Sequence, residues 1–92
     1  MFSVCTYYNV VIKSIIIENG ITSIGESAFY DCSSLKSIII PDSVKKIESY
    51  AFRGCSSLTS ITIPDSVTEI ESDAFRGCSS LTFMSNFVRV HN

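Results

Sequence analysis

The sequence has no tryptophan, one histidine, two prolines and only 17% charged residues among its 92. Nine acidic and seven basic side chains give a net charge of −2, and no basic run occurs. Nucleic-acid binding is not expected, because it needs a concentrated positive surface. The lone imidazole, His91, lies next to the end of the chain and gives little basis for acid–base or metal chemistry. The hydrophobic share of 46% is typical of a globular chain and argues against long disorder.

Long hydrophobic runs are also missing. No unbroken aliphatic stretch is longer than that of Ile15–Ile17, which is far shorter than the ~20 residues needed to cross a bilayer, so no membrane span is expected. The first eight residues lack the basic region, the apolar core and the cleavage site of a secretory signal. No Asn-x-Ser/Thr sequon occurs either. The location expected by default is therefore cytoplasmic.

An internal repeat of 23 residues organises the chain. Residues 35–57 and 58–80 are identical at 18 of 23 positions, and residues 12–34 match 35–57 at 11 positions. We therefore divide a single predicted domain, 1–92, into a degenerate N-terminal remnant or cap (1–11), three repeats (12–34, 35–57 and 58–80) and a partial repeat with a C-terminal tail (81–92).

Each copy contains three short segments. In the third copy, Ile61 and Ile63 alternate with polar residues, which predicts a strand because side chains alternate across a sheet. A Pro-Asp-Ser turn and a short extended or bent segment follow. The segment 72–78 is predicted to form one or two helical turns, with Ser72 as N-cap and Gly77 as a left-handed stop.

One copy cannot bury its own apolar face, so neighbouring copies must stack with equivalent side chains in columns. The parallel strands of successive copies are expected about 4.8 Å apart. The columns expected in the core are those of Leu58, Ile61, Ile63, Val67, Ile70, Ala74 and Phe75. The pattern therefore predicts a solenoid; the alternative is a small α+β domain with a coincidental duplication.

These residues resemble a known family. The pattern Leu-x-x-Ile-x-Ile-Pro-x-Ser-Val-x-x-Ile-x-x-x-Ala-Phe-x-Gly-Cys-Ser-Ser is similar to the BspA-type leucine-rich repeat, a class of 23-residue repeats. The resemblance covers roughly residues 12–82. It implies an α/β solenoid: a short right-handed leucine-rich-repeat superhelix with a parallel β-sheet on its concave side and short helical turns on its convex side.

The same resemblance implies a non-catalytic protein–protein interaction module with a protein partner. Such repeats occur in surface proteins of host-associated bacteria and parasitic protists, where they are associated with adhesion and host-protein binding. A cell-surface location is therefore the implied alternative to the cytoplasmic default. The alternative function is a structural remnant, or a fragment of a larger repeat array, with no specific ligand of its own.

Side chains that leave the core on the strand face form the candidate protein-binding surface. They are Lys13, Ser14, Ile16, Lys36, Ser37, Ile39, Thr59, Ser60, Thr62 and Phe83. The isoleucines Ile16 and Ile39 favour binding, since contiguous apolar groups on a surface usually have a function. The alternative is structural, because a tightly stacked parallel sheet tolerates hydroxyl and β-branched side chains at such positions.

Cysteine recurs once per copy, at Cys32, Cys55 and Cys78, while Cys5 lies outside that register. No Cys-x-x-Cys or Cys-His pair occurs, so no metal site is expected. Stacking brings neighbouring sulfurs toward disulfide range, but three equivalents in one column cannot all pair. We therefore expect reduced structural thiols that pack as small apolar residues.

The acidic residues Glu48 and Glu71 share a column, as paired acids do in some hydrolytic sites. The repeat itself explains this pairing, and a solvated ridge does not shift pKa values as a pocket does. Arg53 and Arg76 are expected near these acids on the convex side. The sequence contains no glycine-rich phosphate loop, Ser/His/Asp set or Cys/His pair. We therefore predict no catalytic residues, no cofactor and no enzyme activity.

The ends of a solenoid expose core columns and strand edges, which need covering. The apolar tail contains Phe83, Met84, Phe87, Val88 and Val90. This tail either covers the last copy or forms a sticky surface, and we predict self-association through it. Three well-formed copies are close to the minimum for a stable array, so marginal stability is expected.

Overall fold

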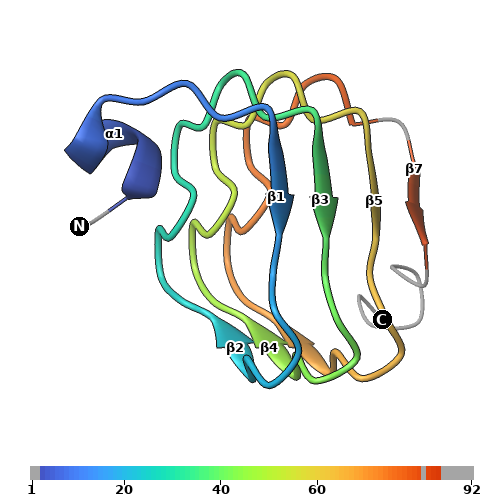
Figure 1. Ribbon diagram of the computed structural model, residues 1–92. Helices are drawn as coiled ribbons and strands as arrows, with labels where there is room; N and C mark the ends of the chain where they lie inside the picture. The colour runs from blue at the N-terminus through green and yellow to red at the C-terminus, as the bar shows by residue number, and fades with distance from the viewer. Residues whose placement is uncertain (1–2, 82, 86–92) are drawn as a thin grey trace.

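The computed structural model describes residues 3–81 and 83–85. Its elements are α1 (Val4–Tyr8), β1 (Ser14–Ile16), β2 (Ser23–Ile24), β3 (Ser37–Ile39), β4 (Lys46–Ile47), β5 (Ser60–Thr62), β6 (Glu69–Ile70) and β7 (Phe83–Ser85). The chain winds through three successive coils, formed by the repeats 12–34 (coil 1), 35–57 (coil 2) and 58–80 (coil 3), as Figure 1 shows.

Parallel strands from successive coils lie side by side, on two sides of the stack (Figure 1). On one side β1 pairs with β3 and β5 pairs with β7, whereas β2, β4 and β6 form a three-stranded sheet on the other. Every pairing joins residues one repeat apart, for example Ser14 with Ser37 and Ser23 with Lys46. The predicted solenoid register is therefore confirmed, and a coincidental duplication in a small α+β domain is excluded.

The core consists of columns of equivalent side chains from successive coils. The buried members of the predicted columns are Leu35, Leu58, Ile38, Ile61, Ile40, Ile63, Val44, Val67, Ile24, Ile47, Ala51, Ala74 and Phe52. Ile21 departs from its column, because it is 46% exposed whereas Val44 and Val67 are buried. It belongs to coil 1, which has no coil before it to cover the side chain.

The phenylalanine column shows the stacking most directly. The ring centres of Phe29 and Phe52 are 5.6 Å apart with 19° between the ring planes, and those of Phe52 and Phe75 are 5.3 Å apart with 8°. Phe52 is fully buried between its two half-buried neighbours. Such stacked rings add to the stabilisation from burial alone. This column therefore ties the three coils into one core.

The helical turns predicted for each copy are replaced by hydrogen-bonded turns in the described residues. In the segment 72–78, Asp73 has a left-handed backbone with φ 61°, so Ser72 caps no helix. The backbone N–H of Phe52 donates to the carbonyl of Ala74 at 2.8 Å, across the coils. Because backbone N–H groups of one coil's turn donate to carbonyls of the next coil's turn, the i to i−4 hydrogen bonds of a helix cannot form. Gly77 has the predicted left-handed backbone, with φ 81°, but it ends no helix.

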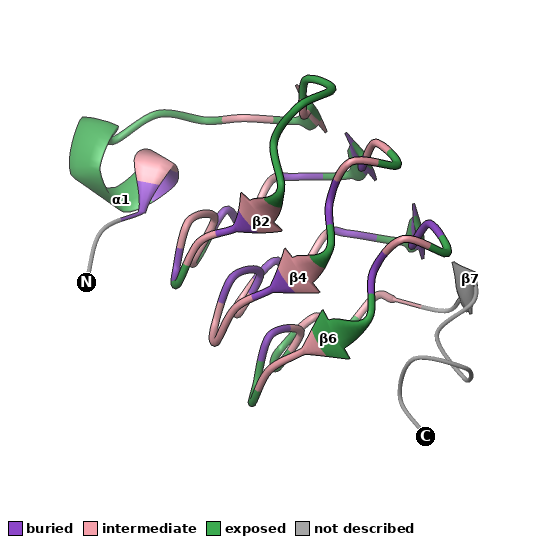
Figure 2. Ribbon diagram, turned by 90° about the horizontal axis from the view of Figure 1, so that it is seen from below, coloured by how far each residue is buried: buried purple, intermediate pink, exposed green. Residues whose placement is uncertain are grey.

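α1 lies at the coil 1 end of the stack (Figure 2). The Val4 N–H donates to the carbonyl of Ala28 at 3.1 Å, and Ser3 Oγ donates to the carbonyl of Tyr30 at 2.6 Å. One coil later, the carbonyl of Ala51, which is equivalent to that of Ala28, accepts a hydrogen bond from the Phe29 N–H of coil 1. The segment before coil 1 thus supplies donors where a preceding coil would supply them.

The expectation of reduced cysteines is wrong for Cys32, which forms a disulfide with Cys5. The two Cα atoms are 5.4 Å apart. The 23-residue register would place Asn9 beside Cys32, but α1 brings Cys5 there instead. Cys55 and Cys78 are free thiols, as expected.

Candidate functional site

The predicted binding residues of the three coils lie together on the face of β1, β3 and β5, which we call the strand strip. It comprises Lys13, Ser14, Ile16, Lys36, Ser37, Ile39, Thr59, Ser60 and Thr62, and all nine are exposed. The tenth predicted residue, Phe83, lies in β7 in register with Ser60 of β5. Binding by the strand strip stays a prediction.

An apolar pair lies in the coil 1 and coil 2 part of the strand strip. Strand alternation turns Ile15 and Ile38 toward the core, so their neighbours Ile16 and Ile39 face outward, 74% and 60% exposed. Ile16 and Ile39 are paired in register on β1 and β3. In coil 3 the equivalent position carries Thr62, so this apolar patch belongs to coils 1 and 2 alone.

One edge of the strand strip carries positive charge. Lys13 and Lys36 are both exposed, and the Lys36 N–H donates to the carbonyl of Lys13 at 2.8 Å. Within the described part of the chain neither side chain forms an ion pair. The strand strip therefore offers an apolar pair, hydroxyl groups and two ammonium groups for non-covalent contacts.

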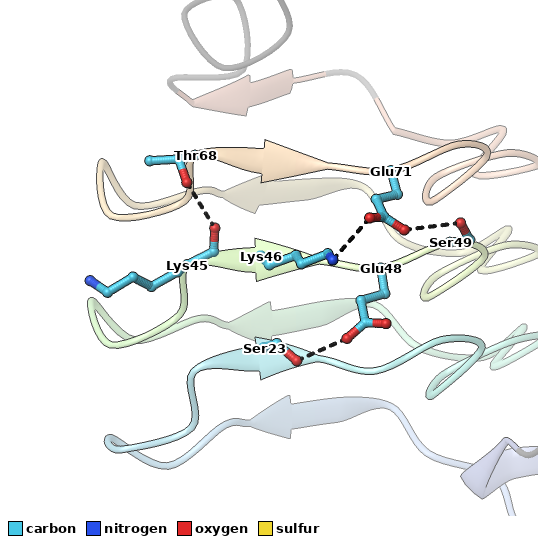
Figure 3. A network of polar contacts seen from close by, with 7 residues as sticks. All are labelled: Ser23, Lys45, Lys46, Glu48, Ser49, Thr68 and Glu71. Carbon is cyan, nitrogen blue, oxygen red and sulfur yellow. Dashed lines mark hydrogen bonds and ion pairs between the residues drawn. The ribbon is translucent and has the colours of Figure 1, made fainter.

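A polar network on the β2–β4–β6 sheet connects the coils (Figure 3). Lys46 Nζ lies 3.0 Å from Glu71 Oε2, and Ser49 Oγ donates to Glu71 Oε1 at 3.4 Å. One coil earlier, Ser23 Oγ donates to Glu48 Oε2 at 3.1 Å. The hydrogen bond from Lys46 holds the pKa of Glu71 below its ordinary value, and the same bond raises the pKa of Lys46. Each carboxylate therefore links two neighbouring coils.

The two equivalent arginines have different neighbours, which the sequence analysis missed. Arg76 Nη1 lies 3.8 Å from Asp73 Oδ2. The guanidinium carbon of Arg53 instead lies 5.6 Å from the ring centres of both Tyr30 and Tyr50. The sequence signal is a difference between copies, because Tyr50 occupies in coil 2 the position that Asp73 occupies in coil 3. Arg53 is thus held by aromatic faces rather than by an acid.

A cavity opens beside α1, on the side of the coils away from the strand strip. Its volume is about 280 Å³, and its lining residues are Ser3, Thr6, Ser27, Tyr30 and Arg53. This volume lies below the range of about 300–1,000 Å³ that is usual for small-molecule sites. This cavity is therefore a weak candidate for a small-molecule site.

The described residues contain neither a metal-binding cluster nor a membrane-spanning helix. In residues 3–81 and 83–85, no group of three or more His, Cys, Asp or Glu side chains is placed to hold a metal ion. No helix in the same part of the chain has both the length and the apolar composition for a membrane span. The tail residues Phe87, Val88 and Val90, predicted to mediate self-association, lie outside the described residues.

Comparisons with known proteins agree with this architecture. The sequence model of the BspA type leucine rich repeat region (6 copies) matches residues 2–90. A leucine rich cell surface protein from Faecalibacterium prausnitzii A2-165 is similar in structure, with a TM-score of 0.76 and 40% identity, over 79% of this chain and 19% of that chain. A leucine-rich repeat protein from Bacteroides ovatus ATCC 8483 is also similar, with a TM-score of 0.75 and 38% identity, over 78% of this chain and 19% of that chain. No curated protein matches the chain significantly.

The chain thus spans 19% of the length of each of these solved proteins. The family match covers nearly all of its residues, and the parallel strands one repeat apart are the architecture that such repeats form. Leucine-rich repeats of this kind are generally non-catalytic. The chain belongs to the BspA type leucine-rich repeat family.

Proposed function

We propose that the chain is a non-catalytic protein-interaction module that binds a protein partner through the strand strip. The observation that carries this proposal is the exposed pair Ile16 and Ile39, side by side on β1 and β3. Adjacent apolar side chains on a protein surface often mark an interface, because their exposure to water is unfavourable. The lysines and hydroxyl groups around the pair favour an extended peptide or a protein surface with apolar and acidic side chains.

The proposal includes a cell-surface role, as part of an adhesin-type protein. One solved relative is named a leucine rich cell surface protein. The Cys5–Cys32 disulfide supports an oxidising compartment, because disulfides persist mainly outside the cytosol. Right-handed winding of the coils belongs to the same proposal, since connections between parallel strands are right-handed in nearly all proteins.

A selection of random peptides displayed on phage tests the proposal without a known partner. Enriched peptides are synthesised, and their affinities are measured for wild type and for a strip variant that combines Ile39→Ala with Lys36→Glu. The matched control, Lys45→Glu, makes the same charge change at an exposed lysine next to β4, outside the strand strip. We expect the peptides to bind the control as tightly as wild type and the strip variant at least about tenfold more weakly, or ~1.4 kcal/mol.

Circular dichroism and urea unfolding establish that all three proteins share one fold. Loss of binding in the strip variant with an unchanged fold supports the proposal. Peptides that bind all three proteins equally would locate the binding surface elsewhere and contradict it.

A second candidate function is structural: a unit within a longer repeat array, with no ligand of its own. The observation that favours it is the partial match to each solved relative, in which this chain aligns with 19% of the length. Under this alternative the phage selection yields no peptide with saturable binding to wild type. A saturable binder that is sensitive to the strip variant would exclude it.

A further inference from the structure

Two thiols, Cys55 and Cys78, occupy equivalent positions in coils 2 and 3 and have no role in the proposed function. Each Sγ donates to a phenylalanine carbonyl one coil earlier, Cys55 to Phe29 and Cys78 to Phe52, both at 3.2 Å. Because the two contacts are equivalent, both side chains leave the backbone in the same direction. Their sulfurs therefore follow one another along the stack.

The backbones that carry these thiols are in direct contact. The Gly54 N–H donates to the carbonyl of Arg76 at 2.8 Å, and a Cβ placed on Gly77 would lie 3.3 Å from Gly54 N. Paired strands are about 4.8 Å apart, and disulfides join residues whose Cα atoms are about 4.4–6.8 Å apart. The spacing of adjacent coils therefore lies within the Cα range of a disulfide.

We propose that Cys55 and Cys78 are the site of a second disulfide, which joins coils 2 and 3 covalently. The oxidant is a small-molecule disulfide of the glutathione type. Since Cys5 already bonds Cys32, the two disulfides together would fix α1 to coil 1 and coil 2 to coil 3. This inference is independent of binding by the strand strip.

The two sulfurs differ in access and in acidity. Cys78 is half-buried, whereas Cys55 is fully buried. Interaction with the neighbouring thiol, and then burial, raise the pKa of Cys55, while the same interaction lowers the pKa of Cys78. Because the thiolate is the reacting form of cysteine, Cys78 reacts first.

The reaction is two successive thiol–disulfide exchanges. The Cys78 thiolate attacks one sulfur of oxidised glutathione, forms a mixed disulfide and releases one glutathione thiolate. Cys55 then gives its proton to solvent and attacks the Cys78 sulfur, which expels the second glutathione. The two protein thiols together lose two electrons and two protons, and one oxidised glutathione becomes two reduced molecules.

The test is oxidation of the purified full chain, with its Cys5–Cys32 bond intact, by oxidised glutathione at pH 8. Trypsin places the two thiols on separate peptides, 54–76 and 77–89. We expect titratable thiols to fall from two to zero per chain. Mass spectrometry without reduction should detect these two peptides as one linked species from a monomeric protein.

Two variants separate the steps. Cys78→Ser should keep one unreactive thiol, and Cys55→Ser should stop at the glutathione adduct of Cys78; circular dichroism verifies that each variant is folded. Three outcomes in wild type would overturn the proposal: persistence of both thiols, a stable adduct on Cys78 without the linked peptide, or a disulfide between two chains.

Discussion

Replacement of the central ring of the phenylalanine column, Phe52→Ala, tests whether the stacked core holds the coils together. Phe52 is fully buried and contacts a ring on each side, with centres 5.6 and 5.3 Å away. The equivalent changes Phe29→Ala and Phe75→Ala each remove a half-buried ring with one stacked neighbour among the described residues. We therefore expect the central substitution to be the most destabilising of the three.

The magnitude follows from burial and stacking. Removal of a buried phenylalanine side chain costs about 3–5 kcal/mol, and each stacked pair adds roughly 0.5–1.5 kcal/mol beyond burial. Domains of this size have a total stability of about 5–15 kcal/mol. Phe52→Ala should therefore remove about a quarter or more of the free energy of unfolding, and Phe29→Ala and Phe75→Ala at least about 0.5–1.5 kcal/mol less each, because each loses one stacked pair instead of two.

Urea unfolding followed by circular dichroism measures these differences. With a slope of about 1–3 kcal/mol per molar urea, the expected loss in Phe52→Ala lowers the midpoint by more than about 1 M. Phe52→Leu is the matched control, because it keeps most of the apolar volume and removes the ring stacking. A midpoint for Phe52→Ala at or above that of Phe29→Ala would refute the argument that the coils share one continuous core.

Three further predictions follow from the ends of the stack and the polar network. Cys5→Ser should lower the free energy of unfolding by about 2–4 kcal/mol and speed amide hydrogen exchange in α1, which would establish the predicted capping role of the N-terminal segment. Glu71→Gln should lower the urea midpoint at pH 7, because it removes the ion pair with Lys46. Since Lys46 holds the pKa of Glu71 down, the stabilisation from this ion pair is present above the ordinary pKa of 4.5 and is lost as the pH falls through the lowered pKa. The difference from wild type should therefore vanish in acid, and a constant difference would argue against the ion pair. If the tail 81–92 mediates self-association, light scattering after size-exclusion chromatography should detect oligomers at high concentration that Phe87→Ser reduces, and a monomeric wild type would contradict the prediction.

The strand register could be predicted because the repeat constrains it directly. Copies of equal length must place equivalent apolar side chains at equal depth, or a buried isoleucine would meet a polar neighbour. Strand alternation then decided the exposure of the strand strip: with Ile38 buried, its neighbours Ser37 and Ile39 must face outward. Which partner these side chains bind depends on a second molecule, so the alternation alone carries no information about it.

The turns could not be predicted because their conformation depends on contacts between coils. Each copy has a left-handed residue at one position, occupied by Ser27, Tyr50 and Asp73, with φ near 60°. None of the three is glycine, so the local sequence gives no clear signal of this backbone. Across the coils, the N–H of Tyr50 donates to the carbonyl of Ser72 at 3.3 Å. Hydrogen bonds of this kind outweigh the weak helical preference of a seven-residue segment.

The disulfide was missed for a related reason. The periodicity predicts only contacts that are 23 residues apart, whereas Cys5 and Cys32 are 27 apart. α1 interrupts the repeat before coil 1, and the hydrogen bonds of Val4 and Ser3 to the carbonyls of Ala28 and Tyr30 hold Cys5 near its partner. A contact between an irregular end and a regular array cannot be deduced from the array alone.

The positions at which the second and third copies differ indicate where the array is free to vary. The five differences are Lys36/Thr59, Ile39/Thr62, Lys45/Thr68, Lys46/Glu69 and Tyr50/Asp73, and none of these side chains is buried. Buried positions stay identical because each must match the coil above and the coil below, whereas exposed positions carry no such constraint. Two of the five differences fall on the strand strip, where an isoleucine and a lysine in coil 2 become two threonines in coil 3. A partner that contacts the apolar pair would therefore find it at one end of the stack only, which would fix both its position and its direction on an otherwise repetitive surface.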